Sequence, residues 1–165
     1  MPTIWNEDQV TLPRLAEHLE DAGLIKVTLG SDYIGLHSPN GLYHVVLIDH
    51  ERKYLRIRMT LPLDKCRSRF DKLELIQRYS FQLILSRFSL DNDDDLRVEN
   101  DISFENGLII SQFMKLLNRF ALLCLFLVED DNEDGLICLE EAATQNEDAD
   151  PLQLDESIPK NVVLN

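Results

Sequence analysis

The chain has 165 residues, 44% of them hydrophobic, and a formal net charge of -14 at pH 7. This length and composition suffice for one domain with a substantial core, and hardly for two. The acidic balance argues against generic binding to nucleic-acid phosphates, which depends on clustered Lys and Arg. The cysteines are widely spaced and form no C-x-x-C pair, which favours reduced thiols over a disulfide framework or a zinc site; they are Cys66, Cys124 and Cys138.

Residues 1–10 are expected to form a loose lead-in, with Trp5 packed onto the domain. They contain neither the basic nor the apolar region of an export signal, so we expect a cytoplasmic protein. A short amphipathic helix follows over residues 11–23, where Thr11 is the N-cap and Gly23 ends the helix.

Four β-like segments then alternate with turn sequences rich in Gly, Asn, Asp and Pro. They are residues 24–29, 33–37, 42–49 and 54–61. Their short connections predict antiparallel pairing. Apolar and polar residues alternate in the last segment, which predicts one buried and one exposed face. The third segment has apolar residues on both faces, which is typical of a more central strand.

A second helix and a second hairpin follow. Ser68 is the expected N-cap of a helix to about residue 80, and four residues are spaced for one face of it: Phe70, Leu73, Ile76 and Tyr79. The first strand of the hairpin starts at Phe81, where the apolar period approaches two, and the second covers residues 96–104. A last helix spans residues 111–128.

The last helix changes character along its length. Its first half is amphipathic, whereas its second half is apolar on all sides, because Leu122 and Leu125 continue the face that is polar one and two turns earlier. The run is too short to span a bilayer, which needs about 20 apolar residues, so no membrane partner is expected. We predict that the two leucines are covered by Ile4 and Trp5 of the same chain, by a second copy, or by a protein partner.

The element order α-ββββ-α-ββ-α predicts one α+β domain over residues 11–128, an antiparallel β-sheet with helices packed on it. Two motifs within it are Arg87-Phe88-Ser89-Leu90-Asp91 before an acidic turn and a strand, and Glu105-Asn106-Gly107-Leu108 before the long apolar helix. Together they resemble the C-terminal half of the YbjN-like bacterial domains, described as candidate sensory-transduction regulators, and the resemblance covers roughly residues 12–128.

This resemblance implies the fold of type III secretion chaperones, because the YbjN-like domains share it. It also implies a noncatalytic protein-binding module, chaperone-like or regulatory, that holds a segment of a partner polypeptide. The fold relatives are small acidic dimers, so a homodimer is one candidate assembly. The resemblance carries over no catalytic residue.

The residues themselves show no enzyme site. The four histidines lack metal-ligand spacing; they are His18, His37, His44 and His50. Cys66 has basic neighbours but no partnered histidine, which is weak support for a nucleophile. Neither a G-x-S-x-G motif nor a phosphate-binding glycine loop occurs in the sequence. We therefore expect a protein that is not an enzyme.

Half of the basic residues, 8 of 16, lie within residues 52–72, where Asp64 and Asp71 are the only acids. We expect a solvated sheet face and helix start in this strip. The alternative is a site for an acidic partner or for the acidic C-terminal residues of the same chain.

Residues 129–165 contain 12 of the 30 acidic residues and one basic residue, which predicts a disordered acidic tail. Within it, residues 130–141 match the EF-hand loop D-x-N-x-D-G-x5-E. The calcium ligands would be the side chains of Asp130, Asn132 and Asp134, the carbonyl of Leu136 and the carboxylate of Glu141. The exit helix would have almost no apolar face, so a calcium-responsive adaptor is the alternative hypothesis, and no other cofactor is expected.

Overall fold

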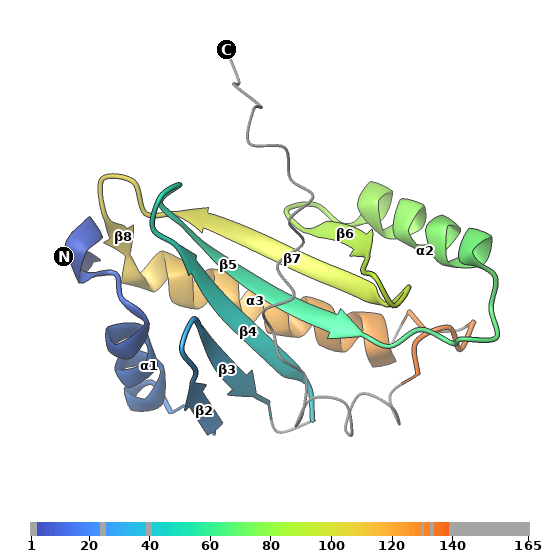
Figure 1. Ribbon diagram of the computed structural model, residues 1–165, viewed down its shortest axis with the longest axis horizontal. Helices are drawn as coiled ribbons and strands as arrows, with labels where there is room; N and C mark the ends of the chain where they lie inside the picture. Colours follow the sequence, from blue (N-terminus) through green and yellow to red (C-terminus); the bar gives the residue numbers. More distant parts are fainter. Residues whose placement is uncertain (1–2, 24–25, 39–40, 130, 133, 139–165) are drawn as a thin grey trace, which may run out of the picture.

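The structure, a computed structural model, describes residues 3–23, 26–38, 41–129, 131–132 and 134–138 (Figure 1). These residues form an α+β fold, as predicted. Its elements in chain order are β1 (Ile4–Trp5), the short helix η1 (Glu7–Gln9), α1 (Leu12–Asp21), β2 (Lys26–Leu29), β3 (Tyr33–His37), β4 (Tyr43–Asp49), β5 (Tyr54–Leu61), α2 (Arg69–Gln82), β6 (Arg87–Leu90), β7 (Leu96–Ser103), β8 (Leu108–Ile109) and α3 (Ile110–Glu129).

Six strands form one antiparallel sheet in the order β2-β3-β4-β5-β7-β6. The four predicted strands and the second hairpin are confirmed, and β4 occupies the inner position that its two apolar faces indicated. Figure 1 shows α3 running behind this sheet, α1 beside β2 and β3, and α2 beyond the opposite edge, next to β6.

The core lies between the sheet and α3. One side of β5 is buried, as its alternation predicted, and it faces the buried side of α3: the residues are Leu55, Ile57, Met59, Leu61, Phe113, Leu117, Phe120, Cys124 and Leu127. Full burial stabilises the fold by about 1.5–3 kcal/mol for each large apolar side chain. By length and composition alone α3 could cross a membrane, a test that the core helix of a water-soluble domain also passes.

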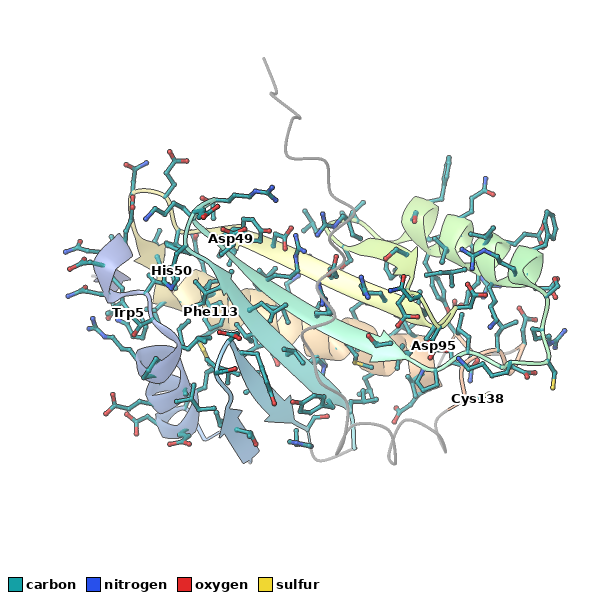
Figure 2. All side chains as sticks on the ribbon, in the orientation of Figure 1. Trp5, Asp49, His50, Asp95, Phe113 and Cys138 are labelled. Atoms are coloured by element: carbon teal, nitrogen blue, oxygen red, sulfur yellow. The ribbon has the colours of Figure 1, made fainter. Side chains whose placement is uncertain are left out.

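The N-terminal lead-in is part of the fold. Residues of β1 pair with β8, Ile4 with Ile109 and Trp5 with Leu108. Trp5, which is labelled in Figure 2, is buried, as expected, and its ring stands edge-on to His18 of α1 at 5.6 Å. Two strands of two residues each give no periodic signal in a sequence, which is why the pairing was not predicted.

The second hairpin begins later than predicted. Helix α2 continues to Gln82, and its last backbone bond runs from the Leu83 N–H to the Tyr79 carbonyl at 2.8 Å. Strand β6 therefore starts at Arg87, and the predicted start at Phe81 is wrong. The apparent period of two arose from Phe81 and Leu85, which point into solvent and form no strand face.

The predicted disorder after residue 128 does not hold for the described residues up to Cys138. Leu136 and Ile137 are buried, and Ile137 forms an antiparallel bridge with Leu63. The Cys138 N–H donates to the Pro62 carbonyl at 2.9 Å. Figure 2 shows Cys138 at the same end of the molecule as Asp95 of the β6–β7 turn. Two large apolar side chains suffice to anchor an otherwise acidic segment; residues 139–165 lie outside the described part of the chain, and their disorder stays a prediction.

Candidate partner-binding surfaces

Helix α2 is positioned by its cap and by a narrow buried side. The Ser68 hydroxyl accepts the Asp71 N–H at 3.2 Å, which completes the predicted cap. The buried positions are Lys72, Leu75 and Tyr79, which lie on one side of the helix at about 100° per residue.

The opposite side of α2 and the loop after it expose large apolar side chains. We call this surface the α2 face, and its members are between 47% and 89% exposed: Phe70, Leu73, Phe81, Ile84 and Leu85. The sequence placed Phe70 and Leu73 on one face with Tyr79, and this grouping is wrong because Tyr79 lies on the buried side. The sequence signal for the buried side of α2 is the pair Leu75 and Tyr79, which lie one helical turn apart.

The loop between α2 and β6 holds its apolar residues outward at a conformational cost. Leu85 has φ 72°, a left-handed backbone that a residue with a bulky side chain rarely adopts. The buried Asn100 fixes this loop: with its amide oriented to suit its neighbours, its nitrogen donates to the Ser86 hydroxyl at 2.8 Å and to the Leu85 carbonyl. The exposure of Ile84 and Leu85 is therefore built into the fold.

The outer side of α3 exposes a second, smaller apolar surface. Leu122 is 57% exposed, as its position in the sequence indicated, and Phe126 is 40% exposed. Leu125 is only partly buried and packs against the edge of the core. The alternative cover, Ile4 and Trp5, is excluded because β1 lies at the opposite end of α3, where the Ile110 N–H donates to the Thr3 carbonyl at 3.1 Å.

The basic strip at residues 52–72 is largely neutralised within the domain. The sheet register places Arg58 opposite Glu99 in a 2.7 Å ion pair, and Arg56 opposite Asp101 at 2.8 Å. Further pairs join Lys53 to Glu7, Lys65 to Asp95 and Arg69 to Asp94. The alternative use, a contact with the acidic C-terminal residues, occurs at Arg67, whose guanidinium donates to the Asp134 carbonyl at 3.2 Å.

Three of the predicted calcium ligands are bonded to other groups of the protein. The Asn132 side chain exchanges two 2.9 Å hydrogen bonds with the backbone of Ile137. The Leu136 carbonyl accepts the Asp64 N–H at 2.9 Å, and the Asp134 carboxylate pairs with Arg78 at 3.4 Å. The other two predicted ligands, Asp130 and Glu141, lie outside the described residues. Calcium binding stays an untested prediction with nothing in this geometry to favour it.

The described residues bring together no catalytic set. The four histidines pack separately, each against one aromatic ring: Trp5, Tyr43, Phe120 and Phe104. Burial lowers the pKa of His44 to about 4, so this imidazole is neutral at physiological pH. Burial also raises the pKa of the Cys124 thiol far above its ordinary range. No group of three or more His, Cys, Asp or Glu side chains that could hold a metal occurs in this part of the chain.

The sheet and its three helices define a known class of fold, that of the YbjN-like domains and the type III secretion chaperones, as predicted. The structure is similar to YbjN from E. coli, with a TM-score of 0.65 and 15% identity, over 78% of this chain and 96% of that one.

Two further similarities are to complexes. One is to a chain of the HopA1–SchA chaperone–effector complex, with a TM-score of 0.50 and 12% identity over 66% of this chain and 85% of that one. The other is to a chain of the ExsC–ExsE complex, with a TM-score of 0.53 and 18% identity over 75% of this chain and 91% of that one. At these identities the similarity establishes the fold alone. No family model and no curated relative matches the chain.

Proposed function

We propose that this protein is a noncatalytic protein-binding module, chaperone-like or regulatory, that holds a segment of a partner polypeptide. The observation that carries the proposal is the α2 face, where five large apolar side chains of one helix and the loop after it stand in solvent. Burying one such side chain is worth about 1.5–3 kcal/mol, so a partner that covers the face gains substantial free energy. None of the five is charged, which is typical of the centre of an interface.

The fold supports the same proposal. A chaperone–effector complex is among the structures with this fold, and YbjN is a candidate transcription regulator. The exposed side chains also favour a protein partner, because they are large, apolar and contributed by one helix and the loop after it. A second copy of this chain is one partner that such a surface accommodates.

We propose no catalytic role, no cofactor and no nucleic-acid partner. The separate packing of the histidines and the neutralised basic strip support this part of the proposal. We also place the protein in the cytoplasm, in keeping with three cysteines that form no disulfide in the described part of the chain.

The test is to identify the partner and then to measure binding with purified components. Affinity-tagged full-length protein is isolated from its native cell, associated proteins are identified by mass spectrometry, and the purified candidate is titrated by calorimetry. We expect Phe81→Ser with Ile84→Ser to weaken the affinity at least about tenfold, which corresponds to 1.4 kcal/mol. Light scattering over a concentration series shows whether the same variant also dissociates a homodimer.

The matched control removes two apolar groups from the other surface, in Leu122→Ser with Leu125→Ser. Circular dichroism confirms that both double variants are folded. If the control loses binding and the α2 variant does not, Leu122 and Leu125 are the partner site, as the sequence predicted. If neither variant changes the affinity or the molecular size, the exposed apolar surfaces do not bind a partner and the proposal is wrong.

A further inference from the structure

The outer side of α3 differs from the α2 face in its charge. Four residues at spacings of four, three and four share one side of the helix, and we call them the α3 face: Lys115, Arg119, Leu122 and Phe126. All four are exposed. Within the described part of the chain, neither cation forms an ion pair with a carboxylate, unlike most of the basic residues of the sheet and α2. Glu129, the last residue of α3, is also exposed on this side, which leaves the side with two cations and one acid. The α3 face therefore suits a segment that is both acidic and apolar.

We propose that this segment is residues 139–165 of the same chain. These 27 residues contain seven acids and one base, Lys160. Leucines at 152 and 154 precede Asp155 and Glu156, and Ile158 follows them, so apolar and acidic groups alternate at short intervals. The apolar groups match Leu122 and Phe126, and the carboxylates match the two cations.

The segment is long enough to reach the surface that it would cover. The Asp131 N–H donates to the Phe126 carbonyl at 3.1 Å, where the chain leaves α3. It is then fixed to the end of β5 through Cys138. From that point 27 residues reach at most about 90 Å when extended, whereas a helix of 20 residues is about 30 Å long. Tethering by a short linker gives an effective concentration of the order of millimolar, so even weak contacts suffice for docking.

The other apolar surface does not suit this segment. The cations next to the α2 face in the chain, Arg69 and Arg87, are already paired with carboxylates, so acidic groups lying on this face would lose solvation without gaining an unpaired cation. The two surfaces thus have different occupants, a partner on the α2 face and the chain itself on the α3 face. The docking of residues 139–165 does not depend on the proposed function of the α2 face.

The experiment is photo-crosslinking in the full-length protein. One variant carries p-benzoylphenylalanine in place of Phe126, and the matched control carries it in place of Phe81, an equally aromatic and more exposed position. We expect illumination to join position 126 to peptides from residues 139–165, and position 81 to form no such product. Arg119→Glu should lower the yield several-fold, and Arg52→Glu, which reverses a charge at a distant turn, should leave it unchanged. If the Phe126 variant does not fold, the probe is placed at Leu122.

Several results would overturn the proposal. One is the absence of crosslinks to residues 139–165 from position 126, and another is an equal yield from position 81. Crosslinks between differently labelled copies, in an equal mixture of ¹⁴N and ¹⁵N protein, would assign the segment to a second molecule. If Arg119→Glu leaves crosslinking unchanged but abolishes binding to vesicles of phosphatidylcholine and phosphatidylserine, the α3 face serves a lipid surface instead.

Discussion

Helices α2 and α3 both expose large apolar side chains, but they distribute their residues in opposite ways. Helix α3 buries Phe113 and Phe120 against the sheet and exposes a mixed surface, which includes Phe126, outside. Helix α2 buries Lys72, which is 3% exposed and donates to the Asp94 carbonyl at 3.2 Å, while Phe70 and Phe81 stand in solvent. Of the apolar residues of α2, Leu75 and Tyr79 join the chain's own core, whereas Phe70, Leu73 and Phe81 do not. A cluster of exposed apolar residues, unlike a single one, indicates a partner.

The largest expected effect contrasts the inner side of α3 with the α2 face. Phe120 is fully buried and packs edge-on against His44 at 5.7 Å. Phe120→Ala should lower the free energy of unfolding by about 3–5 kcal/mol, because it leaves a cavity in the core. Phe81→Ala makes the same substitution at an exposed position and should change the free energy of unfolding by less than about 0.5 kcal/mol. Urea denaturation of both variants measures the contrast, and a loss of more than about 2 kcal/mol for Phe81→Ala would show that Phe81 packs on its own domain.

The second prediction concerns the segment that connects the two helices. The Asp131 N–H donates to the Phe126 carbonyl at the end of α3, Arg78 of α2 pairs with Asp131 and Asp134, and Leu136 is buried. Leu136→Ala should therefore cost about 2–5 kcal/mol. A chain that ends at Glu129 should lose at least as much, measured by thermal denaturation. An unchanged melting temperature would instead support the sequence-based expectation that the whole region after residue 128 is disordered.

These two contrasts show what the sequence could and could not specify. The alternation in β5 and the long apolar period of α3 each report burial directly, so the sheet, the core side of α3 and the exposure of Leu122 were predictable. In α2 the exposed phenylalanines have the spacing of a core face, and only tertiary packing reveals that Lys72 takes the inner position. Leu136 and Ile137 were hidden because the average composition of an acidic region outweighs two apolar residues.

The third prediction is that acid pH lowers the stability of α3 against local unfolding more than that of α2. The side chain of His44, a residue of β4, packs against Phe120 of α3, and its folded pKa of about 4 is below the ordinary value of 6.5 because burial disfavours the charged ring. The unfolded chain then binds the proton first, so stability is complete above pH 6.5 and falls as the pH decreases from 6.5 towards 4. The loss attributable to this group approaches about 3 kcal/mol.

Hydrogen exchange of α3 amides at pH 7 and pH 5 measures this effect, with α2 amides as the internal reference. In His44→Leu protein the extra acid loss should be absent. Equal acid dependence in the variant and the wild type would mean that His44 does not set the stability of the α3 side.

The smallest expected effect lies at Leu85 in the α2 face, where stability and binding should change in opposite directions. Its φ of 72° is strained for leucine, whereas asparagine adopts the left-handed region more readily. Leu85→Asn should therefore raise the free energy of unfolding by up to about 1 kcal/mol. It should also lower the affinity for the partner, because an apolar contact is lost. Ile84→Asn is the matched control: Ile84 is exposed and has no left-handed backbone, so binding should weaken without a gain in stability. If Leu85→Asn destabilises the protein, the Leu85 side chain supports its own domain, and the strain at this position cannot be attributed to the display of a binding surface.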